Sequence, residues 1–234
     1  MDTDRRRIIV FVKYPLENAV KTRLARDIGA VCAAGLSRAM ATDAVEAALE
    51  TGREVLVAFT PDENAAAFAD WLGGDVRFEP QGTGDIGARM LRSFESAFAA
   101  GVSSAVLIGS DIPDLSAHII NRAFALLAVH DAVLGPAADG GYYLIGFSGR
   151  GFLPAVFAGM QWSTALVAGR TLDILRDSGK NCALLPKLRD IDTLEDLRSW
   201  MADTKTAGVR AGQRVRSTHT RRYCENELAK EAGS

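Results

Sequence analysis

Several features that would place this chain in a familiar class are missing from its sequence. Its 234 residues include three cysteines, Cys32, Cys182 and Cys224, whose wide spacing fits neither a zinc site nor a redox-active CxxC pair. The net charge of −2 lacks the basic excess of a general nucleic-acid binder. The apolar run at residues 8–12 is too short for a membrane span or a signal peptide. We therefore expect a cytoplasmic protein with reduced cysteines that binds no nucleic acid and spans no membrane.

Three common phosphate- and cofactor-binding signatures are also missing after the first apolar run. The loop after the first apolar run contains neither the GxxxxGK[ST] sequence of a Walker loop nor the GxGxxG fingerprint of a dinucleotide-binding fold. The D-x-D-x-[TV] sequence of a HAD-type phosphatase is missing after the same run. These absences argue against a P-loop protein, an NAD-linked oxidoreductase and a HAD-type phosphatase.

Short apolar runs rich in β-branched residues alternate along the chain with longer segments of helical periodicity. Strands are predicted at 8–13, 54–60, 76–79, 104–108, 132–134, 142–147 and 182–185, and helices at about 30–50, 63–72, 85–100, 116–129 and 164–178. Continuous apolar strands separated by helices are typical of a mostly parallel sheet that is covered on both faces. We therefore predict an α/β fold with three layers and a doubly wound sheet.

The last part of the chain differs in composition. Thr193 and Asp196 have the spacing of a capping box before an apolar stripe, which predicts a short helix from Thr193. Residues 204–234 contain few large apolar side chains, which predicts a disordered or loosely packed tail after a single domain of residues 1–203. The alternative is a short helix near 223–231 that packs on a second copy of the chain in a homodimer.

Cationic side chains are concentrated after the first predicted strand, in the segment KYPLENAVKTRLARDIGA. In open α/β sheets, ligands bind beyond the carboxyl ends of the strands. Lys13, Lys21 and Arg23 therefore stand where cations and a helix N-terminus can bind phosphate groups. A solvated basic surface is the alternative for these residues taken alone.

A glycine-rich segment, EPQGTGDIGARM, follows the third predicted strand. Gly82 and its neighbouring glycines allow the backbone to approach a ligand closely. Gln81 offers an amide that can read a base edge, and Arg89 adds a cation. We predict that these residues and Asp85 bind a nucleotide; a glycine-rich turn with Asp85 as a helix cap is the alternative.

The fourth predicted strand ends in GSDIPDL, which places a carboxylate directly beyond a buried strand. Pro113 restricts the backbone of Ile112 and so fixes the position of Asp111. Because Mg²⁺ and Mn²⁺ prefer carboxylate and phosphate oxygens, Asp111 is predicted to be a metal ligand and a catalytic residue; a turn or capping aspartate is the alternative. Asp192, after the last strand, is predicted either as a second metal ligand or as a helix cap. Asp114 is either a second metal ligand or a cap for the helix near residue 116, and the cap is favoured.

Two further segments are predicted to face the acceptor substrate. In PAADGGYYLIG, Asp139 is the candidate base, and Gly140 and Gly141 allow close approach of an acceptor. A hairpin turn is the alternative for this segment. Trp162, in GMQWSTALV, is predicted either to stack on a substrate or to anchor the following helix.

Together these segments resemble a known family. KYPLENAVKTRL, QGTGDIGARM, GSDIPDL, PAADGGYYLIG and DIDTLEDL are similar to the bacterial glycosyltransferase-like family often called radical-SAM/selenodomain-associated transferases, in the nucleotide-diphospho-sugar transferase (GT-A) superfamily. They are similar, more distantly, to the phospholactate and molybdenum-cofactor guanylyltransferases. The resemblance covers roughly residues 7–200 and implies a GT-A sheet, a nucleotide site over the first strands and a divalent metal on Asp111. Two features depart from the pattern: Glu17 and Asn18 replace a Pro-Gly pair, and Pro113 replaces the second acid of a D-x-D pair.

The expected activity is a metal-dependent transfer from a nucleotide-activated donor to a small-molecule acceptor. In the favoured form, the donor is a nucleotide-sugar; Mg²⁺ or Mn²⁺ on Asp111, with Lys21 and Arg23, stabilises the leaving diphosphate, and Asp139 activates the acceptor. The alternative is guanylyl or cytidylyl transfer from a nucleoside triphosphate to a small phosphorylated acceptor. A non-catalytic nucleotide-binding protein is the third hypothesis, motivated by Glu17 and by the missing second acid.

Overall fold

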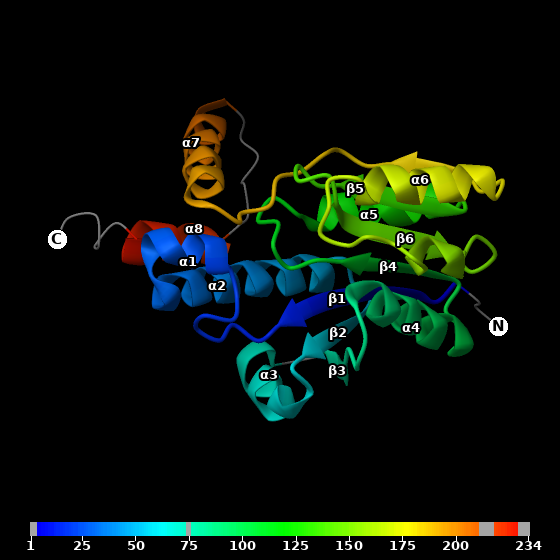
Figure 1. The fold of residues 1–234 in the computed structure, drawn as a ribbon, viewed down its shortest axis with the longest axis horizontal. Coiled ribbons are helices and arrows are strands. Elements are labelled where there is room, and N and C mark those ends of the chain that lie inside the picture. The colour runs from blue at the N-terminus through cyan, green and yellow to red at the C-terminus, as the bar shows by residue number, and fades with distance from the viewer. Residues whose placement is uncertain (1–3, 74–75, 211–217, 229–234) are drawn as a thin grey trace.

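A seven-stranded sheet forms the centre of the molecule (Figure 1). The computed structural model describes residues 4–73, 76–210 and 218–228. The strands are β1 (Arg6–Lys13), β2 (Glu54–Thr60), β3 (Arg77–Pro80), β4 (Ser104–Ile108), β5 (Ala132–Pro136), β6 (Tyr142–Ser148) and β7 (Cys182–Leu184). Their order is β3-β2-β1-β4-β6-β5-β7, and the pairs are parallel except for the two that involve β6. The predicted mostly parallel sheet is therefore confirmed.

Helices cover both faces of this sheet. They are α1 (Thr22–Ile28), α2 (Ala30–Leu49), α3 (Ala65–Leu72), α4 (Ile86–Ala99), α5 (Ala117–Leu127), α6 (Val167–Asp177), α7 (Leu194–Arg210) and α8 (Thr218–Tyr223), with short 3₁₀ turns at Asp62–Asn64 and Pro154–Phe157 and a π-helical turn at Cys224–Leu228. Every helix in the described part of the chain is too short or too polar to cross a membrane.

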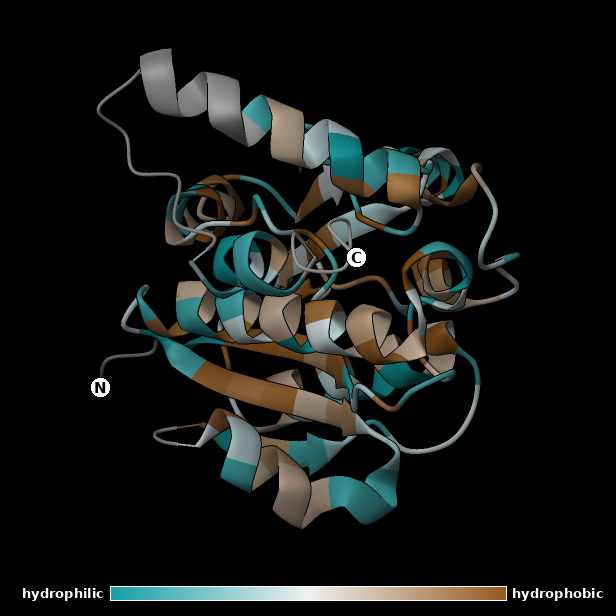
Figure 2. Cartoon of the chain, turned by 90° about the vertical axis from the view of Figure 1, so that its left-hand side faces the viewer, coloured by the Kyte–Doolittle hydropathy of each residue, from teal (hydrophilic) through white to brown (hydrophobic). Residues whose placement is uncertain are grey.

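The two faces of the sheet explain why the strands are apolar throughout. Successive side chains of a strand point to opposite faces. Ile8 and Val10 of β1 pack in a core with α2, α3 and α5, whereas Ile9 and Phe11 pack in a second core with α4 and α6. Figure 2 shows the apolar strands enclosed between helices, so the predicted three-layer α/β architecture is also confirmed.

Two helices differ from the sequence-based prediction. The segment after Lys21 forms a separate helix, α1, which ends where Gly29 adopts a left-handed φ of 80° before α2. Helix α7 begins with the predicted capping box, because Asp196 N donates to Thr193 Oγ1 (3.2 Å) and Thr193 N donates to Asp196 Oδ2 (2.8 Å). This helix continues to Arg210, past the predicted end of the domain at residue 203.

The described part of the C-terminal tail packs on its own chain. Helix α8 lies against α2, and both Thr220 and Cys224 are buried. The expectation of a loosely packed tail is therefore wrong for residues 218–228. The helix expected near 223–231 begins instead at Thr218 and contacts α2 of the same chain; residues 229–231 lie outside the described part of the structure.

Candidate functional site

Lys21 forms ion pairs with two acids from distant parts of the chain, Asp111 and Asp192. It precedes α1 and has a left-handed backbone conformation with φ of 46°. Its Nζ lies 3.1 Å from Asp111 Oδ2, beyond β4, and 2.8 Å from Asp192 Oδ1, before α7. The side chain of Lys21 is only 3% exposed. Three residues that the sequence assigns to separate motifs therefore meet at one point.

The neighbouring charges shift the pKa values of Lys21 and Asp192. Burial would lower the pKa of Lys21, but the carboxylates of Asp111 and Asp192 outweigh burial and raise it. Burial would raise the pKa of Asp192, but Lys21 and Arg23 outweigh burial and lower it. Arg23 Nη2 lies 2.7 Å from Asp192 Oδ2 and is held in the more exposed part of the site. Two carboxylates and two cations thus balance each other.

The two carboxylates fit a hard divalent cation. Asp111 and Asp192 contribute oxygen atoms that converge on one point, and oxygen is the ligand type that Mg²⁺ and Mn²⁺ prefer. The Asp111 side chain is 54% exposed, which leaves it open to an incoming cation with bound water or phosphate. Of the two alternatives for Asp192, the structure does not show the helix cap, and the role as a metal ligand stays a prediction. Thr193 and Asp196 cap α7 instead.

Asp139 lies in the turn between β5 and β6. Its Oδ1 accepts a hydrogen bond from Gly141 N (2.8 Å). Gly140 has a φ of 91°, and a Cβ there would overlap the backbone of Ala165, so a glycine is required by both conformation and packing. The contacts of Gly140 and Gly141 are those of the hairpin turn that the sequence offered as an alternative.

Asp190 is an acid of this region that the sequence-based site prediction missed. Burial raises its pKa, and the negative charges of Asp139 and Asp192 raise it further. Asp190 therefore connects the Asp139 turn electrostatically with the Lys21 cluster. The segment LRDIDT contains two acids, Asp190 and Asp192, two positions apart. The site prediction used Asp192 alone.

The glycine-rich segment after β3 is held in place by its own polar side chains. Gln81 is buried, its Nε2 donates to the carbonyl of Ala58 (2.9 Å), and its Oε1 accepts from Arg89 Nη1 (3.3 Å). Arg89 Nε also donates to Gly84 O (3.0 Å). Asp85 caps α4 by accepting from Ala88 N (2.8 Å), as the structural alternative expected. In this state the Gln81 amide is engaged within the protein rather than offered to a base edge.

The three remaining predicted residues, Lys13, Gly82 and Trp162, have structural roles in the folded chain. Lys13 Nζ donates to Ala19 O (2.7 Å) and so spans the loop between β1 and α1. Gly82 has a φ of 72° and bends the segment after β3. Trp162 packs over Gly87 at the start of α4, and its buried indole nitrogen has no hydrogen-bond partner among the described residues. This packing agrees with Trp162 as an anchor for the segment before α6.

Asp114 does not cap α5 as predicted. Its Oδ1 accepts a hydrogen bond from Trp200 Nε1 of α7 (2.9 Å), and burial raises its pKa. The N-cap of α5 is Ser116. The acid is therefore used to join α7 to the loop that carries Asp111, a long-range contact that no local pattern indicates.

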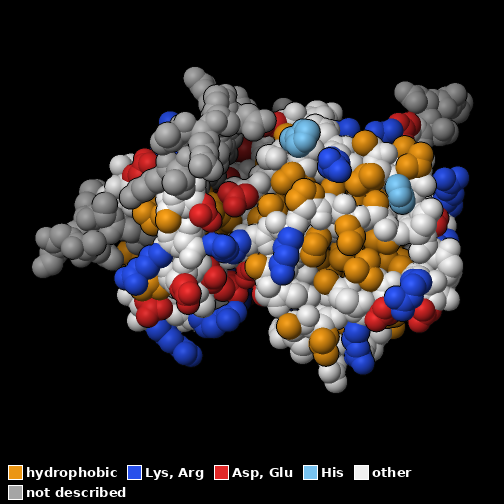
Figure 3. All heavy atoms as spheres, turned by 90° about the horizontal axis from the view of Figure 1, so that it is seen from above, with side chains coloured by type: hydrophobic (Ala, Val, Ile, Leu, Met, Phe, Trp, Pro, Cys, Tyr) orange, Lys and Arg blue, Asp and Glu red, His pale blue; other side chains and the backbone are white. Residues whose placement is uncertain are grey.

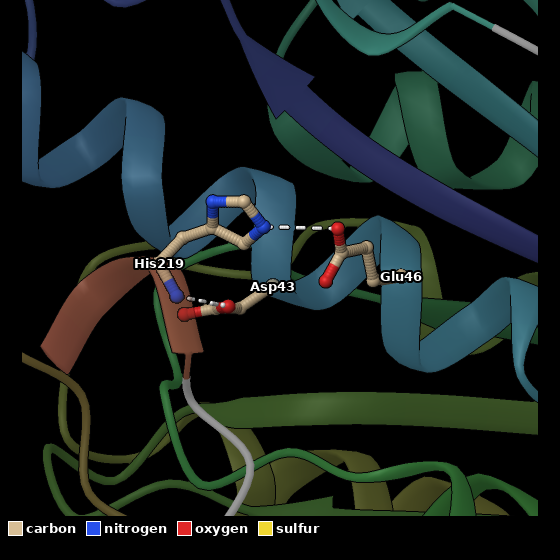
Figure 4. Close-up of side chains that lie close together, drawn as sticks. All are labelled: Asp43, Glu46 and His219. Atoms are coloured by element: carbon tan, nitrogen blue, oxygen red, sulfur yellow. Dashed lines mark hydrogen bonds and ion pairs between the residues drawn. The ribbon is translucent and has the colours of Figure 1, made fainter. Parts of the chain in front are cut away.

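A second group of polar side chains lies between α2 and α8 (Figure 4). Asp43, Glu46 and His219 each bring one ligand atom to within 4.8 Å of the others, a spacing compatible with a metal ion. Asp43 already accepts three hydrogen bonds: one from the backbone N–H of His219 (2.9 Å), and two from the N–H (2.9 Å) and hydroxyl (2.6 Å) of Thr220. His219 Nε2 lies 2.9 Å from Glu46 Oε1. We interpret this group as the contact that docks α8.

The charged residues of the surface are unevenly distributed around the Lys21 cluster. Charged side chains of both signs gather towards the end that carries α1 and α8, whereas apolar side chains are prominent on the other part of the same face (Figure 3). Lys21, Asp111 and Asp192 all follow strands or precede helices at the carboxyl edge of the sheet. This is the edge at which open α/β sheets bind their ligands.

The sheet order and the helices on both of its faces define a nucleotide-diphospho-sugar transferase-like fold. The chain belongs to a family of uncharacterized proteins conserved in bacteria (DUF2064), which residues 42–164 match. The narrower radical-SAM/selenodomain-associated type stays a prediction. No curated protein matches the chain in sequence.

Solved structures with similar folds include several transferases. An inferred nucleotide-diphospho-sugar transferase from Desulfovibrio desulfuricans G20 is 33% identical, with a TM-score of 0.87 over 98% of both chains. A nucleotidyl transferase from Methanothermobacter is 17% identical, with a TM-score of 0.60 over 87% of this chain and 99% of the other. A Mycobacterium tuberculosis H37Rv protein in complex with manganese is 14% identical, with a TM-score of 0.54 over 85% of this chain and 98% of the other. The last two likenesses concern the fold alone.

Proposed function

We propose that this protein is a metal-dependent transferase that takes its donor group from a nucleotide-activated substrate. The observation that carries the proposal is the nearly buried Lys21, bound to both Asp111 and Asp192 at the carboxyl edge of the sheet. Cations and carboxylates that balance each other at this edge suit a ligand that brings both a diphosphate and a divalent cation. The similarity to an inferred nucleotide-diphospho-sugar transferase supports the same class of donor.

Each residue of the cluster has a role in this proposal. Asp111 and Asp192 would hold Mg²⁺ or Mn²⁺, and such a cation supplies stabilisation for the charge on the leaving phosphate oxygens. Lys21 and Arg23 would bind the same diphosphate once the carboxylates have another partner. Asp139 would orient the acceptor hydroxyl and accept its proton.

The favoured reaction is glycosyl transfer from a nucleotide-sugar. The acceptor oxygen forms a bond to the anomeric carbon of the sugar, the bond between that carbon and the diphosphate oxygen breaks, and the acceptor proton passes to Asp139. The nucleoside diphosphate leaves with the electron pair of the broken bond. The diphosphate gains negative charge in this step, and Lys21 and Arg23 would stabilise that charge.

Nucleotidyl transfer is the second candidate, because Lys21 and Arg23 together are suited to a triphosphate and because a nucleotidyl transferase shares the fold. A phosphate oxygen of the acceptor would then attack the α-phosphorus of a nucleoside triphosphate, and pyrophosphate would leave. The attacking oxygen is already anionic, so this reaction needs no base. Asp139→Asn should therefore reduce glycosyl transfer strongly and nucleotidyl transfer little.

Ligand-induced shifts of the melting temperature test the proposal on the full chain. Nucleoside triphosphates and nucleotide-sugars are added with and without Mg²⁺ or Mn²⁺; a ligand at 100 times its Kd stabilises the folded state by about 2.7 kcal/mol. We expect a metal-dependent shift in the wild type that is lost in Asp111→Asn and kept in Asp62→Asn, a matched control on an exposed acid.

The outcomes separate the candidate functions. A shift with a nucleotide-sugar favours glycosyl transfer, and a shift with a triphosphate alone favours nucleotidyl transfer. Binding without turnover of any donor and acceptor would favour a non-catalytic nucleotide-binding protein. If no nucleotide shifted the transition, with or without metal, the proposal would be wrong.

A further inference from the structure

The C-terminal segment, Thr218–Leu228, is fixed to the middle of α2 by one buried carboxylate. Asp43 is 6% exposed and accepts hydrogen bonds from the first turn of α8, through the backbone N–H groups of His219 and Thr220. The hydroxyl of Thr220 donates to the same carboxylate at 2.6 Å. Hydrogen bonds to a carboxylate are among the stronger ones in proteins, and Figure 4 shows the bond from the His219 N–H to Asp43. The segment is therefore docked by a specific interaction.

A second feature of α2 is matched to the same segment. Gly35 lies inside this helix, and a Cβ at this position would overlap the ring of Tyr223. Glycine is unfavourable in a helix interior. The absence of a side chain at Gly35 creates room for the Tyr223 ring, independently of the Asp43 contact.

The docked segment completes a small core that adjoins the candidate site. Cys224 is buried in this core with Leu24 of α1 and Ile191; the other buried members are Leu36, Met40, Leu197 and Trp200. Leu24 is three residues from Lys21, and Ile191 is the neighbour of Asp192. The same core therefore holds the two chain segments that bring Lys21 and Asp192 together.

Lys21 needs such support because of its backbone conformation. A left-handed residue other than glycine is strained and persists only where its surroundings fix it. Within its own helix α1, Leu24 is the buried residue, so the helix depends on the core that Cys224 helps to complete. Small displacements of charged groups at a binding site can have large effects on activity.

We propose that Thr218–Leu228 is a positioning element of the candidate site, and that Asp43, by holding this segment on α2, keeps Lys21 and Asp192 in contact. The significance of that contact for catalysis rests on the proposed function, whereas the coupling between the segment and the contact does not. Asp43 acts through α8 and the small core, and it is a positioning residue rather than a catalytic one.

Hydrogen–deuterium exchange and Mn²⁺ binding on the full chain test the proposal. In Asp43→Ala, we expect exchange to accelerate at least tenfold in residues 218–228 and, with them, in residues 20–28 and 188–193. The Kd for Mn²⁺ in the presence of a nucleoside triphosphate, measured by electron paramagnetic resonance, should rise at least fivefold. Asp43→Asn keeps one accepting oxygen, so its exchange rates and its Kd for Mn²⁺ should lie between those of Asp43→Ala and the wild type.

Two more variants make the result decisive. Gly35→Ala should displace the Tyr223 ring and give the same pattern by a different route, which also replaces Asp43→Ala if that variant does not fold. Phe98→Leu, in the core on the other face of the sheet, is the control for a general loss of stability and should leave exchange in residues 20–28 unchanged at a similar melting temperature.

The possible results either support or overturn the proposal. If residues 218–228 were released while residues 20–28 and 188–193 kept their wild-type exchange, the segment would be a surface attachment and the proposal would be wrong. It would also be wrong if Asp43→Ala left residues 218–228 protected. If the wild type bound neither Mn²⁺ nor nucleotide, the proposed function would fail, and the exchange measurements would still decide the coupling.

Discussion

Replacing Lys21 by methionine tests whether charge holds the centre of the candidate site together. Methionine has an unbranched side chain of similar length, so the backbone at φ of 46° and most of the packing are retained. Removing one partner of a buried ion pair costs about 3–5 kcal/mol. Because Asp111 is 54% exposed and Asp192 keeps Arg23, solvent and Arg23 offset part of this cost. We expect the free energy of unfolding at pH 7 to fall by about 1–3 kcal/mol.

The size of this loss should depend on pH. Burial alone would raise the pKa of Asp192, but Lys21 and Arg23 lower it in the folded protein, below the value of about 3.9 in an unfolded chain. Stability that comes from a lowered carboxyl pKa is present above the unfolded pKa and is lost as the pH falls through the folded one. The variant has lost much of this contribution, so its deficit relative to the wild type should shrink as the pH falls below about 4. The raised pKa of Lys21 affects stability only above about pH 10.

Urea unfolding of both proteins at pH 7 and at about pH 3, below the unfolded pKa of Asp192, measures the deficit. Lys13→Met is the matched control, because the exposed Lys13 ammonium donates, within the described part of the chain, only to the carbonyl of Ala19. It should lower the free energy of unfolding by less than about 1.5 kcal/mol, with little pH dependence. Equal deficits of Lys21→Met at the two pH values would refute the ion-pair reasoning and assign the effect to packing.

Three further substitutions test other contacts that the structure shows. Gln81→Ala leaves the buried carbonyl of Ala58 without its donor and should lower the free energy of unfolding by about 1–3 kcal/mol in urea titrations. Gly87→Ala places a methyl group against the Trp162 ring and should cost about 1–3 kcal/mol; a variant that melts with the wild type would contradict this close packing. Thr193→Ala breaks the capping box of α7 and should cost about 0.5–2 kcal/mol, with faster amide exchange confined to the first turn of that helix.

The strands of the sheet could be predicted because their burial leaves a local signal. In β1, neighbouring residues such as Ile8 and Ile9 face different cores, so the strand reads as a continuous apolar run. Helix α1 left no such signal: its sequence, TRLARDI, buries Leu24 and is otherwise polar or less buried. It forms because Leu24 enters a core made by residues far along the chain, and that contact is invisible in a local window.

The candidate site could be predicted as a set of residues but not as a set of contacts. The position of Asp111 beyond a buried strand indicated its location at the carboxyl edge of the sheet. The bridge from Lys21 to Asp192 joins residues 171 positions apart, and only the fold brings them together. Gln81 shows the opposite case: an amide that was predicted to face a ligand is used to hold its own loop to β2.

The C-terminal segment was misjudged because its attachment depends on specific complementarity to α2. Composition measures how much apolar area a segment can bury, and residues 204–234 can bury little. Thr220 and Tyr223 instead fit two specific features of α2: the carboxylate of Asp43 and the space above Gly35. Such complementarity between distant elements has no signature in the sequence of either one.

The charge balance of the cluster also bears on how a ligand would enter. Without ligand, Lys21 and Arg23 balance Asp111 and Asp192, and a divalent cation alone would have to displace a buried ammonium that then lacks an anion. A cation that arrives with a diphosphate offers each group a new partner: the carboxylates gain the metal, and Lys21 and Arg23 gain the phosphates. This exchange keeps the buried charges paired, so we expect Mn²⁺ to bind at least tenfold more tightly with a nucleotide than alone. Equal Mn²⁺ affinities in the two conditions, measured by electron paramagnetic resonance, would show that Lys21 does not compete with the metal.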